Sequence, residues 1–181
     1  KAGFRPDRTI DTYTQILKKL YPHTPVVVGG IEASLRRLTH YDYWSDKLQR
    51  SILATSGADL LIYGMGDKVI RDVAKAMRNG FNMKLLRGLR QVGFMADKEY
   101  VERLYSGKTI VLNSFEQCVE DKKKFGKNFC EIEVLSNMMK CETTLVEPVD
   151  DRYVVITPPY ERLTTEELDH SFDLPYERAP H

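Results

Sequence analysis

Pro25-Val-Val-Val-Gly-Gly30 and Asp59-Leu-Leu-Ile-Tyr-Gly-Met-Gly66 are the two stretches that decide the fold class of this chain. Each is a short apolar run followed by glycines, which predicts a strand buried on both faces, as in a parallel sheet. Amphipathic spacing predicts helices over residues 7–21 and 67–78, and Ser45 is expected to cap a third helix that ends near residue 55. Alternating helices and strands with short connections predict a doubly wound α/β fold built on a parallel sheet.

The pattern of predicted helices and strands changes in the second half of the chain. We therefore expect a separate region over residues 114–181, after an α/β region over residues 1–113. Its helix is predicted by a capping box, and its strand pair by two short runs on either side of a polar turn. The elements expected after residue 80 are strands at 91–96 and 109–112 around a turn at Asp97-Lys98, a long helix opened by Ser114-Phe-Glu-Gln117 that ends near residue 135, a hairpin of 143–146 and 152–156, and a short helix over 164–171. The expected architecture is therefore an incomplete doubly wound parallel sheet with an added helix and β-hairpin.

Composition excludes several classes of protein. The 181 residues carry 27 Lys and Arg against 26 Asp and Glu, and this net charge of +1 gives no bulk reason to expect nucleic acid or a membrane surface as a partner. No apolar run approaches the ~18 residues of a membrane-spanning helix. The three cysteines are too widely spaced for close zinc or iron–sulfur pairs, so we expect free thiols, no metal site and a reducing cytoplasm. Both chain ends read as cuts inside a longer protein.

The glycine turns are the first candidate site. Because parallel strands end at the same edge of a sheet, we expect both turns to lie at the edge where such folds bind ligands. Glycines permit close backbone approach to a phosphate, a nucleotide tail or a flat ring, although neither a dinucleotide-binding fingerprint nor a P-loop is present. The alternative is that these are tight turns packed on neighbouring loops. The candidate residues here are Gly29, Gly30, Glu32, Ser34, Gly64, Gly66 and Asp67, with Asp67 as the expected helix N-cap.

The second candidate is the segment over residues 35–47, which we expect to be a loop. Arg36 and Arg37 could bind a phosphate or a carboxylate. His40 and Asp42 could form an acid–base pair or a ligand pair. The neighbouring rings, which belong to Tyr41, Tyr43 and Trp44, could stack on a planar ligand. The alternative is a loop whose aromatic side chains fill the gap between the sheet and a second domain.

A third feature is the basic run Lys122-Lys-Lys124. A nucleic-acid patch is one interpretation. Glu116, Glu120 and Asp121 lie beside the run, however, so a solvated helix face is the favoured interpretation. No catalytic residue is predicted in this chain.

Residues 29–47, which read Gly-Gly-Ile-Glu-Ala-Ser-Leu-Arg-Arg-Leu-Thr-His-Tyr-Asp-Tyr-Trp-Ser-Asp-Lys, resemble the YgiQ family of radical SAM proteins. The resemblance spans the chain through further stretches: Lys1-Ala-Gly-Phe-Arg-Pro-Asp-Arg8, Ser51-Ile-Leu53, Ala58–Gly66, Asp151-Arg-Tyr-Val-Val155, Thr165-Glu-Glu-Leu168 and Asp173–His181. It implies a cobalamin-binding-like, Rossmann-like α/β domain over residues 1–113, and a connector over 114–181 that leads toward a radical SAM barrel.

In the longer protein that the resemblance implies, the barrel holds a [4Fe-4S] cluster through a C-x-x-x-C-x-x-C motif and cleaves S-adenosylmethionine. This chain lacks that motif, so no cofactor is expected within it. Cobalamin stays an open possibility, because the loop that carries the lower-ligand histidine in true cobalamin binders would precede Lys1.

Three functional hypotheses follow. The first is an auxiliary domain, inactive by itself, that docks through residues 35–47 on the radical SAM barrel of the same polypeptide and helps to shield its small-molecule chemistry, whose substrate is unknown. The second is a nucleotide- or cobalamin-binding module that uses the glycine turns with Arg36 and Arg37. The third is a noncatalytic scaffold that uses the lysine-bearing helix and the hairpin.

Overall fold

The structure is a computed structural model that describes residues 3, 6–104, 108–177 and 179. Its elements are α1 (Thr9–Leu20), β1 (Val27–Val28), α2 (Gly30–Leu35), β2 (His40–Asp42), β3 (Lys47–Gln49), α3 (Ile52–Ser56), β4 (Leu60–Ile62), α4 (Asp67–Arg78), α5 (Met83–Leu86), β5 (Val92–Ala96), α6 (Lys98–Leu104), β6 (Thr109–Val111), α7 (Phe115–Glu120), α8 (Lys122–Ser136), β7 (Thr144–Val149), β8 (Arg152–Ile156) and α9 (Thr165–Phe172). Helices and strands are mixed along the first half of the chain, as the α/β prediction requires, but the hairpin of β2 and β3 interrupts the predicted alternation.

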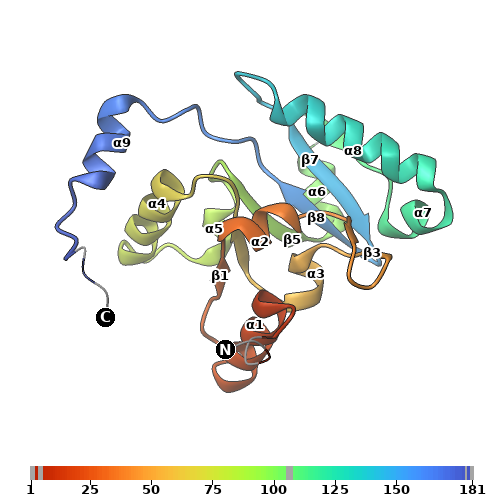
Figure 1. Cartoon of the computed structure of the whole chain (residues 1–181), viewed down its shortest axis with the longest axis horizontal. Coiled ribbons are helices and arrows are strands. Elements are labelled where there is room, and N and C mark those ends of the chain that lie inside the picture. Colours follow the sequence, from red (N-terminus) through yellow and green to blue (C-terminus); the bar gives the residue numbers. More distant parts are fainter. Residues whose placement is uncertain (1–2, 4–5, 105–107, 178, 180–181) are drawn as a thin grey trace.

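The larger sheet has six strands in the order β1-β4-β5-β8-β7-β6 (Figure 1). β1 runs parallel to β4, as the two glycine-ended stretches predict, and β6 runs parallel to β7. The pairs β4–β5, β5–β8 and β8–β7 are antiparallel, so the sheet is mixed, and the predicted hairpin of β7 and β8 lies inside it instead of being added to a parallel sheet. An apolar run indicates that a strand is buried on both faces. It does not indicate whether the strand runs parallel or antiparallel to its neighbours.

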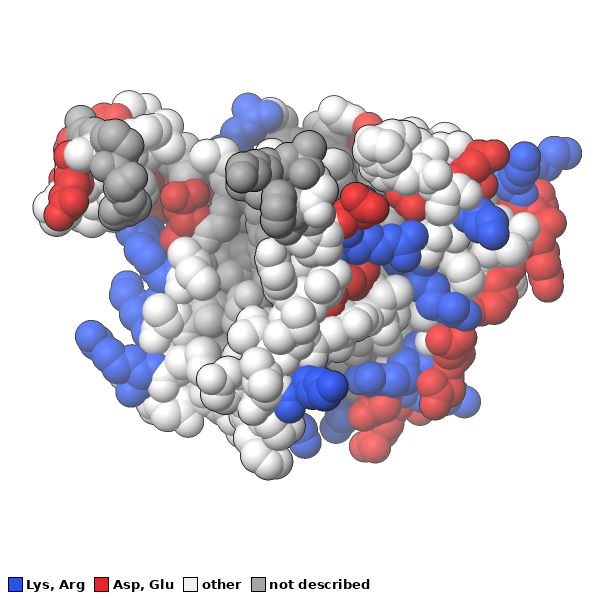
Figure 2. Space-filling view, turned by 60° about the horizontal axis from the view of Figure 1, so that its bottom comes forward, with Lys and Arg blue, Asp and Glu red and all other residues white. Residues whose placement is uncertain are grey.

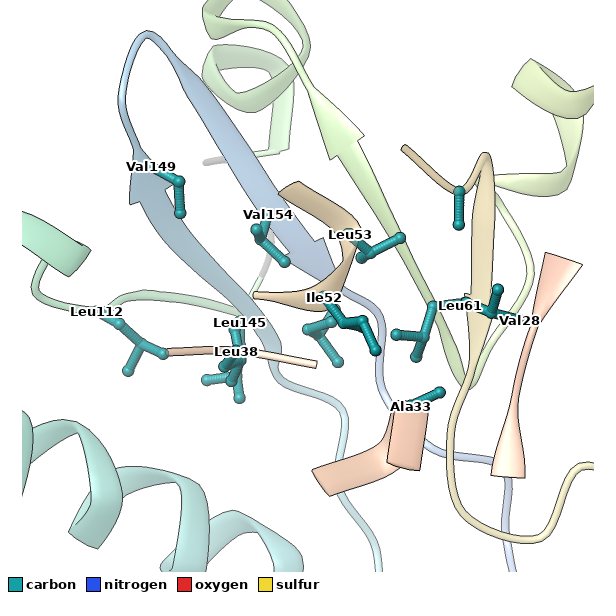
Figure 3. Close-up of a cluster of buried hydrophobic side chains, with 12 residues drawn as sticks. Val28, Ala33, Leu38, Ile52, Leu53, Leu61, Leu112, Leu145, Val149 and Val154 are labelled. Atoms are coloured by element: carbon teal, nitrogen blue, oxygen red, sulfur yellow. The ribbon is translucent and has the colours of Figure 1, made fainter. Parts of the chain in front are cut away.

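Helices cover both faces of this sheet, and alternate residues of each strand supply two apolar clusters. Leu61, Leu145, Val154 and Ile156 face α2, α3 and α8. Figure 3 shows Leu61, Leu145 and Val154 beside Ala33 of α2 and Ile52 and Leu53 of α3. Leu60, Ile62, Val146 and Val155 face α4, α5 and α6 on the other side. In the view of Figure 1, α8 lies in front of the sheet and α6 behind it. The result is a helix–sheet–helix arrangement in which the central strands place apolar side chains on both faces, with Glu147 of β7 as a buried acidic exception.

The regions 1–113 and 114–181 contribute to one sheet. β8 pairs with β5 through Gly93 and Ile156, and β7 pairs with β6 through Ile110 and Leu145. The predicted hairpin is confirmed, and its first strand runs on to Val149, so that only a tight turn with Asp150 at φ 54° joins β7 to β8.

Several predicted helix boundaries are wrong, and each has a local cause. The third helix begins at Ile52, because the hydroxyl of Ser51, and not that of Ser45, accepts the N–H of Leu53. The long helix is divided at Asp121, which adopts an extended backbone and caps α8 by accepting the N–H of Lys123.

Three helices, α2, α5 and α6, are missing from the prediction because all three are short. Asp97 does not lie in a plain turn. Its carboxylate accepts the N–H of Tyr100 and so stabilises the start of α6. Both predicted capping boxes, at Ser114 and Thr164, are confirmed.

The helix α1 presents an uncovered apolar stripe. The apolar residues whose spacing predicts this helix are Ile10, Tyr13, Leu17 and Leu20. Of these four, Ile10 packs against the core, while Leu20 is 64% exposed. Figure 2 views the molecule from the side of α1 and shows a broad central area without charged side chains, with basic and acidic groups interspersed beside it. Among the described residues, no helix combines the length and apolar character needed to cross a membrane.

Gly93 lets α3 lie close to the sheet, which makes it a test of the packing. A Cβ at this position would lie 2.7 Å from Cδ1 of Ile156 and 3.3 Å from Cδ1 of Leu53. Gly93→Ala should therefore lower the free energy of unfolding by about 1–3 kcal/mol through overpacking, as measured by urea denaturation.

The matched control is Gly126→Ala, because a Cβ at Gly126 meets nothing within 4 Å and the residue lies inside α8. This substitution should stabilise the fold by up to about 1 kcal/mol through helix propensity. Equal stability of the two variants would contradict the packing described for α3.

Candidate functional site

The two glycine turns meet at one edge of the sheet, as the sequence predicts. Val27 and Val28 pair with Leu60 and Leu61 in parallel, so the turns follow neighbouring strand ends. The hydroxyl of Ser34 joins them, because it donates to the carbonyl of Gly30 at 2.8 Å and accepts the N–H of Gly64 at 3.0 Å. A role for this edge in ligand binding stays a prediction.

Local backbone geometry and packing explain why glycine stands at these positions. Gly30 and Gly64 have φ of +82° and +66°, which L side chains rarely adopt. A Cβ on Gly29 would lie 3.4 Å from the carbonyl oxygen of Ile62, and one on Gly66 would lie 3.1 Å from Cγ2 of the same residue. The crowding shows that the turns pack closely on the strand end.

Asp67 was predicted to cap α4, and this is wrong. Gly66 occupies the N-cap position, and Asp67 is the first residue of the helix, where it is exposed. A carboxylate in the first turn still complements the helix dipole, so its place is explained by the helix alone.

Residues 35–47 do not form a loop. They contain the end of α2, then β2, the turn over residues 43–46 and the first residue of β3, and β2 and β3 pair as an antiparallel hairpin. The predicted pair of arginines is separated by this geometry. Arg36 forms an ion pair with Glu32 at 3.2 Å, whereas the guanidinium of Arg37 lies over the ring of Tyr63, 5.2 Å from its centroid.

A buried carboxylate fixes this segment to the sheet. Glu147 lies in the middle of β7 with 1% of its surface exposed, and both of its carboxylate oxygens accept the N–H of Thr39, at 2.9 and 3.0 Å. Burial raises the pKa of Glu147 to about 7. We did not predict a role for Glu147; the available signal was an acidic residue inside an otherwise apolar strand.

His40 and Asp42 lie on the same face of β2, but each is engaged elsewhere. Nδ1 of His40 lies 3.1 Å from the carbonyl oxygen of Leu38, and burial lowers the pKa of the imidazole, so the neutral ring is favoured. Asp42 accepts hydrogen bonds from Ser45 at 2.7 Å and from Arg8 at 3.2 Å, and these hold the pKa of its carboxyl below the usual range. These contacts give both side chains structural roles in the hairpin.

The aromatic side chains of the hairpin are turned to solvent. Tyr43 and Trp44 are 68% and 75% exposed, and their ring centroids lie 4.8 Å apart. Tyr41 donates its hydroxyl proton to Asp46 at 2.6 Å. It also lines an apolar cavity of about 360 Å³ between the hairpin and α8, together with Leu35, Leu38, Phe125, Phe129 and Ile132.

The three cysteines are free thiols, as predicted, and they do not converge. Cys118 is buried beside Asn128, and burial raises the pKa of its thiol to about 11. Cys141 is buried near Thr143, and Cys130 is exposed on α8. Within the described part of the chain, no group of three or more His, Cys, Asp or Glu side chains could hold a metal ion. The described residues therefore do not fit an iron–sulfur cluster.

The chain is similar to a set of longer proteins. The model of the family described as "Radical SAM N-terminal" matches residues 1–181. A "UPF0313 protein" of Porphyromonas gingivalis is 46% identical over 188 aligned residues, covering 100% of this chain and 28% of the relative. Proteins with the same name from Bacteroides thetaiotaomicron and Clostridium botulinum are 45% and 38% identical, and the chain covers 30% and 27% of their lengths. The chain thus spans less than a third of these relatives, and no solved structure matches it.

The buried carboxyl of Glu147 predicts a pH-dependent stability. Its folded pKa of about 7 lies above the ordinary value of 4.5, so the folded state holds a proton that the unfolded chain releases. The protonated carboxyl of Glu147 therefore contributes its full stabilisation below about pH 4.5, and this contribution is lost as the pH rises through about 7. The total loss in the free energy of unfolding is on the order of 3 kcal/mol. Glu147→Gln keeps an acceptor for Thr39 without titrating, so urea denaturation should show a smaller loss of stability between about pH 5 and about pH 8 than in the unsubstituted chain.

The control for this experiment is Glu99→Gln, because the side chain of Glu99 is 81% exposed. It should leave the pH profile unchanged. If Glu147→Gln and Glu99→Gln gave the same profile, Glu147 would be an ordinary carboxylate in the folded state.

Proposed function

The chain belongs to the radical SAM N-terminal family, and we propose that it is an auxiliary domain, inactive by itself, which docks on a radical SAM barrel in the same longer polypeptide. The length of the relatives supports this assignment, since the chain covers 28% of the Porphyromonas gingivalis protein. The separate positions of Cys118, Cys130 and Cys141 also support it. On this proposal the cluster, S-adenosylmethionine and the small-molecule substrate are bound outside the described residues.

The observation that carries the proposal is the pair of exposed rings at the hairpin turn. Tyr43 and Trp44 leave most of their surface in water, although aromatic side chains gain free energy when they are covered. Large aromatic groups exposed next to each other are typical of interaction surfaces. The hairpin is therefore the proposed docking surface.

The hairpin is held rigidly enough to serve as a docking element. Glu147 binds the backbone just before β2, and Asp42 is tied to Arg8 and Ser45. An interface that is ordered before association loses less conformational entropy when it forms. The aromatic turn would therefore dock without refolding.

The apolar surface continues from the hairpin onto α8. Leu35 and Phe129, which are 70% and 56% exposed, line the cavity of about 360 Å³ together with Tyr41. A barrel that covered this surface would remove it from water, and packing over the mouth of a reaction site excludes water from reactive intermediates. This is the contribution that we assign to the domain.

A second candidate function is a cobalamin-binding-like or nucleotide-binding module at the glycine turns. The specific observation in its favour is that Ser34 brings Gly30 and Gly64 together at the ends of parallel strands. Neither turn contains a histidine that could serve as the lower ligand of cobalamin. If this second function is correct, adding the protein should change the visible spectrum of cobalamin. The docking proposal predicts no such change.

Photo-crosslinking in the full-length protein tests the docking proposal. Trp44 is replaced by the photoreactive amino acid benzoylphenylalanine, and the crosslinked peptides are identified by mass spectrometry. We expect crosslinks from position 44 to peptides that lie beyond residue 181. An exposed side chain contributes little to the fold, so the replacement should change stability by less than about 0.5 kcal/mol.

Phe81 is the matched control, because it is 48% exposed and follows α4 in the chain. Figure 1 shows α4 on the side of the molecule away from β3 of the hairpin. The same replacement at Phe81 should give no such crosslinks. If position 44 reacted only with peptides from residues 1–181 or with solvent, the hairpin would not be the docking surface.

A further inference from the structure

A second cavity, of about 290 Å³, lies between the sheet edge and the end of α8. The carboxyl ends of β4 and β8 and the amino end of β7 meet there, because β8 is antiparallel to both β5 and β7. Its apolar wall comes from Ile132, Leu135, Met138, Leu145 and Ile156. One cation, Arg37, lies at the other side of this space. The cavity therefore pairs an apolar wall with a positive charge.

Arg37 is a cation that forms no ion pair with the described residues, although the charge of Glu133 acts on it from beyond ion-pair distance. Nη1 donates to the carbonyl of Ser34, and the guanidinium lies over the ring of Tyr63, but the buried Nε–H has no hydrogen-bond partner. Within residues 6–104 and 108–177, no carboxylate lies within ion-pair distance of Arg37, although Arg36 and Arg90 have such partners. Burial lowers the pKa of Arg37, because a charged guanidinium is less stable in a poorly solvated position than in water. Buried cations are normally paired with an anion.

Three hydroxyl groups that line the cavity are already engaged in hydrogen bonds. The hydroxyl of Tyr63 donates to the carbonyl of Thr157 at 2.6 Å. The hydroxyl of Ser34 joins the glycine turns, and that of Thr157 bonds the backbone of Val92. Arg37 is the charged side chain of the described lining, so an anionic ligand would be oriented mainly by its contact with this guanidinium.

Arg37 also borders the cavity between the hairpin and α8, but that space is less suited to an anion. Glu133 lines it, and a carboxylate repels another negative charge in a poorly solvated site. None of the described residues that line the cavity of about 290 Å³ is acidic. An anion is therefore favoured in the cavity at the sheet edge.

We propose that this cavity binds a small carboxylic acid whose carboxylate pairs with Arg37 and whose apolar body lies against Leu135, Leu145 and Ile156. The planar guanidinium matches the two oxygens of a carboxylate. The volume limits the ligand to a small molecule, since pockets for drug-sized ligands start at about 300 Å³. The proposal is independent of docking, because Tyr43 and Trp44 do not line this cavity.

Binding to the full-length protein tests the proposal. The probes are 4-methylpentanoate and phenylacetate, their neutral amides, and inorganic phosphate, each titrated by calorimetry. We expect at least one of the two acids to bind with a dissociation constant below roughly 1 mM and about tenfold or more tighter than its amide, because the amide cannot form the charge-assisted pair. Failure of both acids to bind would overturn the proposal. Equal binding of inorganic phosphate would overturn the assignment to an organic acid.

Two variants place the site. Arg37→Gln should abolish binding of the acid, whereas Arg36→Gln is the matched control and should retain it, because Arg36 pairs with Glu32 and does not line the cavity. Ser136→Phe fills the space from the last residue of α8 and leaves Arg37 in place, so it should also abolish binding even if Arg37→Gln fails to fold. Binding that survives Ser136→Phe would overturn the proposal, whatever the outcome of the crosslinking experiment.

Discussion

The contact between the Glu147 carboxylate and the N–H of Thr39 is the constraint on which the surface of this domain depends. It joins residues that lie 108 positions apart in the chain and places a titratable group at the centre of the fold. Leaving such a group unpaired in the interior is costly, so the segment around Thr39 is held against β7. Arg37 precedes this anchor and lies under α8, while the hairpin follows it and extends to solvent.

The sheet edge shows how the backbone determines where a ligand can fit. The hydroxyl of Ser34 lies between the glycine turns, and Ile62 lies close to Gly29 and Gly66, so the turns pack against one another. The open space lies further along the same edge, where the end of α8 stands away from the strands and leaves the cavity that Arg37 borders. The glycines allow the close packing, and the cavity provides the volume.

The anchored segment around Thr39 therefore positions two surfaces with different chemistry. The hairpin carries exposed rings that suit a large apolar partner, and Arg37, whose Nε–H has no hydrogen-bond partner, carries a charge that suits a small anion. Arg37 and Thr39 are only two positions apart, so the contact of Thr39 with Glu147 helps to position both surfaces.

The sequence by itself determined the α/β class, the two strands that end in glycine, the helix over Asp67–Arg78, both capping boxes and the hairpin of β7 and β8. These features rest on local periodicity and capping chemistry, which act over a few residues. The tertiary structure decided the antiparallel strands, the hairpin within residues 35–47, the separation of Arg36 from Arg37 and the roles of His40 and Asp42. It also gave Glu147 its role. Strand direction and the partner of a buried charge depend on residues distant in the chain, and local spacing carries no information about them.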